Sequence, residues 1–346
     1  MSEEPDPLDP PRPVRRRARP TMVDVAREAS VSLKTVSRVV NGAPNVDPDY
    51  ARRVREAIDK LGFVRNNIAR DLRSNSETAI VGLVIGDLGN TFYSLLARSI
   101  ERVARRNGSL LLIASSEEDP QRERELITEL CERRVDGLIV VPAYADHSFC
   151  AEEMRRGLPM VFLDRHPAGI EADTVMIDND EGAFMGARAL FERGHERIAV
   201  IGQDIRLEAM AQRLAGVTRA AAAAGAGLDD ALVRFGPLTP EQAGHAADEL
   251  LSLPDPPTAF FCCTNRIAQG VINQVWQRGL KVDVAGFDNI ESSHCGPGPV
   301  ATVAYDIEEL GRRSAELLFR RIDGDRGTPE DVIVPVTLIE AAAPGG

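Results

Sequence analysis

The chain has 346 residues, of which 43% are hydrophobic and 27% are charged, and its formal net charge at pH 7 is −12. This composition excludes a wholly disordered chain, and the length predicts two or three domains with a large core. No apolar stretch approaches the roughly 20 residues of a membrane span, and the N-terminus lacks the apolar segment of a signal peptide. We therefore expect a cytoplasmic protein with no membrane partner.

The motifs of common enzymes and metal sites are missing from the sequence. None of the five cysteines forms a C-x-x-C pair, and the five histidines lack the spacing of metal ligands. There is no G-x-x-x-x-G-K-[ST] loop, no H-E-x-x-H and no G-x-S-x-G. We expect no catalytic residue, no metal and no cofactor, so the sequence does not predict an enzyme.

The charge is unevenly distributed along the chain. Residues 12–73 contain 15 Arg or Lys against seven Asp or Glu, whereas the rest of the chain is strongly acidic. A compact basic module on an acidic body is typical of a nucleic-acid-binding protein, although a solvated basic surface would have the same charge. Residues 1–20 are rich in Pro and charged side chains, which predicts a disordered tail.

The first ordered segment predicts a helix-turn-helix. A T-x-x-D capping box at Thr21 begins a short helix, the Ala29–Ser30–Val31 segment interrupts it, and Ser32 caps a second helix. Asp47 then caps a third helix, which ends before Gly62. Two short helices joined by three residues can cross and share a small apolar seam, with the second helix free to enter the major groove of DNA.

The string T-M-V-D-V-A-R-E-A-S-V-S-L-K-T-V-S-R-V-V-N-G over residues 21–42, followed by N-N-I-A-R-D-L over 66–72, resembles the lactose/galactose repressor (LacI/GalR) family of transcriptional regulators. The resemblance implies an all-α DNA-binding domain over 21–65 and a hinge helix with a linker over 66–78. It also implies that Leu72 wedges into the minor groove, whereas packing against the body is the ordinary alternative. The DNA-binding positions implied by the family motif and the exposed face of the second helix are Thr21, Ser32, Leu33, Lys34, Thr35, Ser37, Arg38, Asn41, Asn45, Asn66, Ala69 and Leu72.

Two positions depart from the family pattern. Ser30 stands where the family usually has Gly in the turn, so we expect a left-handed backbone at some energetic cost. Arg65 stands where the family often has Pro before the hinge, which predicts a looser hinge entry or an additional phosphate contact.

The body, residues 79–340, alternates apolar strands with helices. This alternation predicts doubly wound parallel sheets, and two such series with a cleft between them form a hinged small-molecule receptor. The fold resembles the type I periplasmic-binding-protein-like effector domain of the same family, with two subdomains and crossings near residues 175, 303 and 330. A closing segment, Val332–Leu338, is expected as one added strand. The strands expected in the two series are 79–86, 110–114, 137–141, 160–163, 198–201 and 258–263.

Polar and aromatic residues follow the strands, where open α/β sheets bind their ligands. Carboxylates and Arg bind hydroxyl pairs, and aromatic rings pack on the apolar face of a sugar. For Asp164 and Arg165, a simple salt bridge is the alternative. Arg266 adds a positive charge that would favour an anionic effector or point away from the site. The effector-binding positions implied by the resemblance are Asn90, Phe92, Tyr93, Asp164, Arg165, Arg213, Asn265 and Asp288.

The sequence therefore predicts a transcriptional repressor that binds a palindromic operator as a homodimer and is released by a sugar-type effector. The absence of a C-terminal leucine heptad argues against a tetramer. One alternative keeps the DNA-binding role with a purine, nucleoside or sugar-phosphate corepressor. A sugar-binding protein or enzyme without a role in gene regulation is a further alternative.

Overall fold

The computed structural model describes residues 20–40, 43–44, 46–63, 79–143, 145–236, 239–288 and 300–341. The chain divides into two compact units, Met1–Ser76 and Glu77–Gly346, which are described separately below. The predicted tail, apart from Pro20, and the predicted hinge helix at 66–78 lie outside the described residues.

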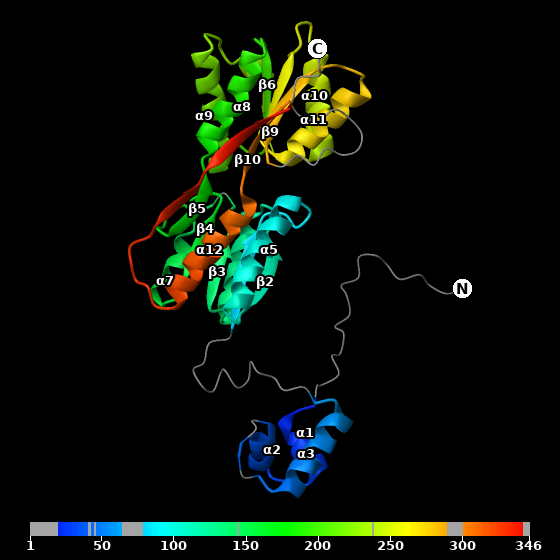
Figure 1. The fold of residues 1–346 in the computed structure, drawn as a ribbon, viewed down its shortest axis with the longest axis vertical. Coiled ribbons are helices and arrows are strands. Elements are labelled where there is room, and N and C mark those ends of the chain that lie inside the picture. Colours follow the sequence, from blue (N-terminus) through cyan, green and yellow to red (C-terminus); the bar gives the residue numbers. More distant parts are fainter. Residues whose placement is uncertain are drawn as a thin grey trace, which may run out of the picture. The chain divides into compact units, whose positions relative to one another are not determined.

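The first unit is a three-helix domain made of α1 (Met22–Ala29), α2 (Leu33–Val40) and α3 (Pro48–Leu61) (Figure 1). Each predicted cap is confirmed. Thr21 forms the capping box of α1, the Ser32 hydroxyl accepts the Thr35 amide at 3.1 Å, and Asp47 caps α3. The three helices bury a small core of Val25, Ala26, Ala29, Val36, Val54 and Ala57.

The turn between α1 and α2 has the left-handed backbone predicted for it. Ser30 has φ 51° and ψ 49°, and its amide closes the C-terminus of α1 by donating to the Ala26 and Arg27 carbonyls. The Arg53 guanidinium on α3 donates to the Ser30 carbonyl at 3.2 Å, which fixes the turn against the third helix. An L-residue in this conformation costs roughly 1–2 kcal/mol relative to glycine.

In the second unit, the first half of the body is a six-stranded parallel sheet in the order β11-β5-β4-β3-β1-β2. Helices α5 and α12 cover one face (Figure 1). Helix α6 lies on the other face, against β1. The elements of this half are β1 (Ile80–Ile85), α5 (Thr91–Arg106), β2 (Leu110–Ser115), α6 (Pro120–Glu132), β3 (Gly137–Val140), α7 (Ala151–Arg155), β4 (Met160–Leu163), β5 (Asp173–Ile177), α12 (Ile307–Ile322) and β11 (Asp331–Val334).

The second half repeats this plan with a sheet in the order β12-β10-β9-β8-β6-β7, in which only β12 is antiparallel to its neighbour among the described pairings. Helix α8 packs on one face and carries α9, while α10 and α11 pack together on the other face. The elements are α8 (Asn179–Glu192), β6 (Ile198–Gly202), α9 (Glu208–Ala223), β7 (Val233–Phe235), α10 (Pro240–Leu251), β8 (Ala259–Cys262), α11 (Asn265–Gln277), β9 (Asp283–Phe287), β10 (Ala301–Tyr305) and β12 (Val336–Glu340).

The chain passes between the two halves at three places: from β5 into α8, from β10 into α12, and from β11 into β12. The last passage corrects the prediction of one strand over Val332–Leu338. Pro335 divides that segment, and the two parts join different sheets. Proline has no N–H to donate to a ladder, so a strand break there is expected.

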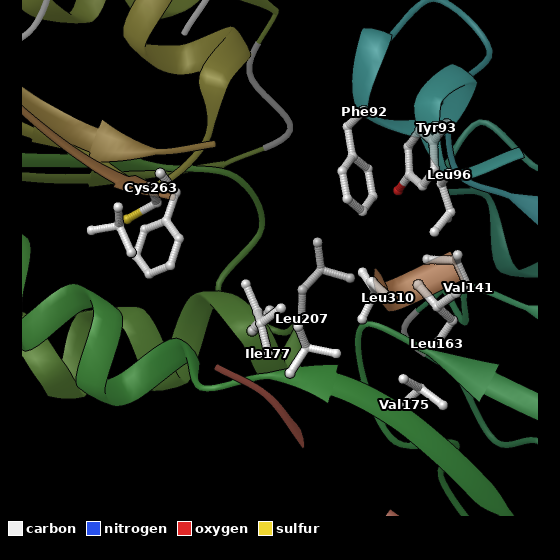
Figure 2. Close-up of a cluster of buried hydrophobic side chains, with 14 of the residues drawn as sticks. Phe92, Tyr93, Leu96, Val141, Leu163, Val175, Ile177, Leu207, Cys263 and Leu310 are labelled. Atoms are coloured by element: carbon white, nitrogen blue, oxygen red, sulfur yellow. The ribbon is translucent and has the colours of Figure 1, made fainter. Parts of the chain in front are cut away.

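The largest buried cluster runs through both halves. Figure 2 shows Phe92 and Tyr93 projecting from α5 toward the region where Ile177 and Leu207 lie. The two halves therefore share apolar contacts beside their crossing points. Within the residues that the structure describes, no helix is long and apolar enough to cross a bilayer.

Candidate functional site

Helix α2 presents an exposed polar N-terminus. Ser32, Leu33, Lys34 and Arg38 are exposed, whereas Thr35 and Ser37 are half-buried. Val36 faces the core, so the helix turns its opposite side to solvent. The Arg38 guanidinium donates to the Pro44 carbonyl at 3.0 Å, which ties the end of α2 to the following loop.

Two predicted DNA-binding residues also have structural roles, because they cap helices. The Thr21 hydroxyl caps α1, and the Ser32 and Thr35 hydroxyls lie 2.9 Å apart at the start of α2. Helix N-termini with exposed hydroxyls are suited to phosphate oxygens. Five further predicted positions lie outside the described residues: Asn41, Asn45, Asn66, Ala69 and Leu72.

In the body, a small cavity of about 40 Å³ lies between the two halves, at the carboxyl ends of the strands. A volume of this size holds water molecules but no sugar ring, so the cleft is closed in this structure. Residues of both halves line it, including all the predicted effector residues except Asn265. The lining consists of Asn90, Phe92, Tyr93, Asp164, Arg165, Gln203, Leu207, Ala209, Met210, Arg213, Thr264, Asp288 and Tyr305.

The two lining aspartates occupy equivalent positions in the two sheets. Asp164 directly follows β4 and Asp288 directly follows β9, with φ angles of 74° and 70°. Each backbone amide donates to the neighbouring strand, Asp164 to the Val175 carbonyl at 2.9 Å and Asp288 to the Val303 carbonyl at 3.0 Å. A positive φ is uncommon outside glycine and concentrates where a side chain must be aimed. The arrangement directs one carboxylate from each half toward the cavity.

Arg165 is buried and its charge is compensated within the first half. Its guanidinium donates to Glu118 at 3.1 and 3.3 Å and to Asp164 at 3.3 Å. Burial lowers the pKa of Arg165, but the two carboxylates outweigh it and hold the pKa above its usual value. The Tyr93 hydroxyl also donates to Glu118 at 3.3 Å, and burial raises the pKa of that phenol.

Arg213 is held by the second half. Its Nε donates to the Asn179 side chain at 2.8 Å, its Nη1 donates to the Cys263 carbonyl, and the guanidinium lies 3.8 Å from the centre of the Phe287 ring. Among the described residues, Nη2 donates to no protein acceptor, which leaves it for a ligand. Gly216 allows this arrangement, because a Cβ there would lie 2.2 Å from the carbonyl oxygen of Asp180 on α8.

Asp288 is a buried acceptor beside this arginine. The Tyr305 hydroxyl donates to its carboxylate. Burial raises the pKa of Asp288, although Arg213 and Tyr305 act in the opposite direction. The pKa of Tyr305 is raised well above its usual value by its own burial and by the charge of Asp288.

The start of α11 differs from the prediction. The Asn265 side chain does not line the cavity, because it donates to the Asn90 side chain in the other half at 3.0 Å; the residue that reaches the cavity is Thr264, one position earlier. Arg266 does not line the cavity either, and it donates instead to Asp87. A change of one residue at a helix start rotates the side chain by about 100°, which decides which neighbour faces the ligand.

Several lining residues were not predicted. Thr264 closely follows β8 and so satisfies the rule that strand ends carry ligand contacts, which means that the sequence contained a usable signal. Glu118, which is not part of the lining but accepts from Arg165, follows β2 in the same way. Gln203, which directly follows β6, carried the same signal. Tyr305 is the last residue of β10 and carried it as well. The other unpredicted members of the lining had no such signal, since they lie at the start of α9: Leu207, Ala209 and Met210. In the part of the chain that is described, no three His, Cys, Asp or Glu side chains are arranged to hold a metal ion.

Comparisons with known proteins agree with this architecture. The model for bacterial regulatory proteins of the lacI family matches residues 21–66, and the model for a periplasmic binding protein-like domain matches residues 187–341. The chain is 33% identical to catabolite control protein A of Priestia megaterium over 87% of this chain and 92% of that protein. It is 32% identical to the HTH-type transcriptional repressor CytR of Escherichia coli (strain K12) over 88% of this chain and 90% of that protein.

Two solved structures illustrate the shared fold. The transcriptional regulator CelR in complex with cellobiose matches with a TM-score of 0.68 and 28% identity, covering 93% of this chain and 98% of that chain. The Lac repressor dimer bound to operator matches with a TM-score of 0.73 and 24% identity, over 93% and 98% of the two chains.

The predicted fold class, a helix-turn-helix domain followed by a periplasmic-binding-protein-like body, is confirmed. The partners of such a protein are operator DNA and a small-molecule effector. The protein belongs to the lacI family of bacterial regulatory proteins, and it is a DNA-binding transcriptional regulator with an effector-binding body.

Proposed function

We propose that the protein is a cytoplasmic repressor without catalytic activity, which binds a palindromic operator as a dimer and releases it when a neutral sugar occupies the cleft. The observation that carries this proposal is the pairing of an exposed recognition helix with a closed polar cavity in one chain. The relatives named above are regulators, which supports a regulatory rather than a catalytic use of the cleft.

The charges around the cavity favour a neutral polyhydroxyl effector. Three carboxylates, Glu118, Asp164 and Asp288, surround two guanidinium groups, and Arg165 already donates to two of those carboxylates. Of the guanidinium nitrogens that line the cavity, Nη2 of Arg213 is the one that donates to no acceptor among the described residues. Carboxylates accept hydrogen bonds from sugar hydroxyls, and the Phe92 ring adds an apolar surface. The cellobiose bound by CelR is a ligand of this chemical class.

A phosphorylated effector is disfavoured by the same arrangement. The two lining carboxylates, Asp164 and Asp288, balance the two lining arginines, so a phosphate would add uncompensated negative charge to the cavity. Arg266 is already paired with Asp87. A nucleoside is neutral and so fits the charge balance better. The Phe92 and Tyr305 rings, which meet edge to face with centres 6.3 Å apart, offer aromatic surface for a base. The effect of the ligand on DNA binding separates the two cases, since an inducer weakens operator binding and a corepressor strengthens it.

We propose that the second copy of the chain covers the edge strand β2. Leu110 and Leu112 lie on the same face of this strand, opposite Ile80 and Gly82 of β1, and Leu110 is 72% exposed. An exposed apolar edge strand invites pairing or aggregation unless another surface covers it. A dimer formed along this edge would pair the free strand and cover its exposed leucines. A twofold dimer also matches a palindromic operator.

The proposed operator recognition is tested by capturing fragments of the source genome on the purified protein at near-physiological salt. The expected result is enrichment of a shared palindrome, which Lys34→Ala weakens or abolishes. Lys60→Ala is the matched control, because it removes the same charge from α3, where Lys60 pairs with Glu28 at 2.7 Å. Sequence-blind recovery that disappears with salt, and is equally reduced by both variants, would indicate phosphate binding alone.

The effector class is tested by thermal melting of the wild type and of Asp288→Asn with neutral monosaccharides and disaccharides, sugar phosphates and nucleosides. Ligand binding stabilises the native state by RT ln(1 + [L]/Kd), where [L] is the concentration of free ligand. We expect stabilisation by a neutral sugar, lost in the variant. Stabilisation by phosphorylated sugars only would contradict the charge argument.

A further inference from the structure

An ion pair joins the two halves of the body beside the effector cavity. Arg266, the second residue of α11, donates from Nη1 to Oδ2 of Asp87, which follows β1 in the other half. The two side chains are 31% and 40% exposed, and neither lines the cavity. The proposed effector contacts therefore leave this pair without a role.

Both partners of the pair are held in place by their own backbone surroundings. The Oδ1 atom of Asp87 accepts the Gly89 amide at 2.7 Å, which leaves Oδ2 for the arginine. The Arg266 amide donates to Oδ1 of Asn265 at 2.8 Å, and Nδ2 of the same asparagine donates to Asn90. Two consecutive residues of α11 thus contact the β1–α5 loop of the opposite half, so the geometry requires a closed cleft.

A competing carboxylate lies on the same half as the arginine. Gly270, one turn after Arg266, packs so closely on α10 that a Cβ there would lie 1.9 Å from the Pro240 carbonyl oxygen. This contact places the N-terminus of α10, where Glu241 lies, beside the second turn of α11, one turn from Arg266. Consistently, the pKa of Glu241 is lowered by the hydrogen bonds that its carboxylate accepts from its own amide and from the Thr239 side chain, and also by the charge of Arg266. Because α10 and α11 belong to one half, this attraction persists when the cleft opens.

We propose that Asp87 and Arg266 form a closure pair that biases the cleft toward its closed form, with Glu241 as the partner of the arginine in the open form. The pair is a positioning device, since it sets the fraction of closed molecules and hence the apparent effector affinity without touching the effector. When the cleft opens, Arg266 loses Asp87 and gains Glu241, so the pair makes only a small difference to the free energies of the closed and open forms. A partly exposed ion pair shifts such an equilibrium by about two- to fivefold.

The inference rests on the proposed function only in assuming that the cleft opens, and its test needs neither DNA nor effector. Donor and acceptor dyes are attached to the full-length chain through Arg98→Cys on α5 and Glu249→Cys on α10, both exposed positions in opposite halves. Cys131 and Cys295 are replaced by Ser. Labelled chain is mixed with an excess of unlabelled chain so that a dimer contains one labelled copy, and single-molecule energy transfer reports the closed and open fractions.

We expect Arg266→Gln and Asp87→Asn to lower the ratio of closed to open molecules by about two- to fivefold. Glu241→Gln is expected to raise it, and the exchange Asp87→Arg with Arg266→Asp to restore it at least to the wild-type value. Arg278→Gln is the matched control, since Arg278 pairs with Asp248 at 2.9 Å within one half, with 34% and 40% exposure. Raising the salt concentration should reduce the effect of Arg266→Gln and leave the control unchanged.

The proposal is overturned if Arg266→Gln and Asp87→Asn leave the energy-transfer distribution where Arg278→Gln leaves it, or if the charge exchange does not restore closure. Failure of the proposed sugar response would be seen separately, as a lack of ligand stabilisation in the wild type, and it would leave this measurement unaffected.

Discussion

Replacing Gly216 by alanine tests how the arginine of the cleft is positioned. An ideal Cβ at residue 216 would lie 2.2 Å from the Asp180 carbonyl oxygen, 2.8 Å from the Ala183 Cβ and 2.9 Å from the Phe184 amide nitrogen. Two of these atoms belong to the α8 backbone and cannot rotate away, so α8 and α9 must separate. Overpacking of this kind costs about 1–3 kcal/mol, and the better helix propensity of alanine returns about 1 kcal/mol.

The closest approach, 2.2 Å to a backbone oxygen, puts the overpacking in the upper part of that range, about 2–3 kcal/mol. We therefore expect Gly216→Ala to lower the free energy of unfolding by about 1–2 kcal/mol, which corresponds to a fall in Tm of about 2–8 °C for a body of this size. Effector affinity should fall as well, because Arg213 lies one turn earlier and donates to Asn179 on α8. Urea unfolding and ligand titration measure the two effects. Gly227→Ala is the control, since a Cβ there would meet nothing within 4 Å. A Gly216→Ala protein as stable as the control would refute the account of the α8–α9 contact.

Three further predictions concern single side chains. Ser30→Gly should stabilise the DNA-binding domain by about 1 kcal/mol, because it relieves the left-handed backbone, and urea unfolding should move to higher midpoints. Asp288→Asn should leave the stability at pH 7 unchanged or higher while weakening effector binding, since burial raises the pKa of Asp288 and its φ of 70° suits asparagine; a large loss of stability in urea would contradict this. Burial lowers the pKa of His166, but Glu208 in the opposite half and Asp331 outweigh it and raise the pKa overall. The stabilisation from the contact between His166 and these carboxylates is therefore fully present below about pH 6.5, and it is lost as the pH rises through the raised pKa of His166. Thermal melts from pH 5.5 to 8.5 should show this dependence in the wild type, with a size below about 1 kcal/mol, and not in His166→Gln.

Local signals predicted the DNA-binding domain well. The caps at Thr21, Ser32 and Asp47, the left-handed Ser30 and the terminal Gly62 depend on interactions within four residues of each position, and all of them occur in the structure. Such signals need no knowledge of the rest of the fold. These local signals do not determine which side of α2 would meet DNA. That side is determined by the burial of Val36 against the other two helices.

The residues of the cleft could be predicted from the sequence only where their position in the chain determines their place in the fold. Asp164 and Asp288 end parallel strands, so their meeting at one edge of the fold follows from topology. Tyr305 and Asn179 escaped prediction because their roles depend on which side chains the second half packs beside them. That Thr264 lines the cavity in place of the predicted Asn265 has a similar cause. The rotation of α11 about its axis is set by its packing against α10 and β9.

The most direct test of the account is the affinity of the full-length protein for its captured palindrome, measured with and without the sugar that stabilises the wild type. We predict that saturating sugar weakens operator binding by at least about fivefold, and that Asp288→Asn, which is expected to lose the sugar, keeps its operator affinity unchanged by it. A sugar that occupies the cleft, as shown by its loss in Asp288→Asn, yet leaves the operator affinity of the wild type unchanged would contradict the proposed coupling between cleft and DNA.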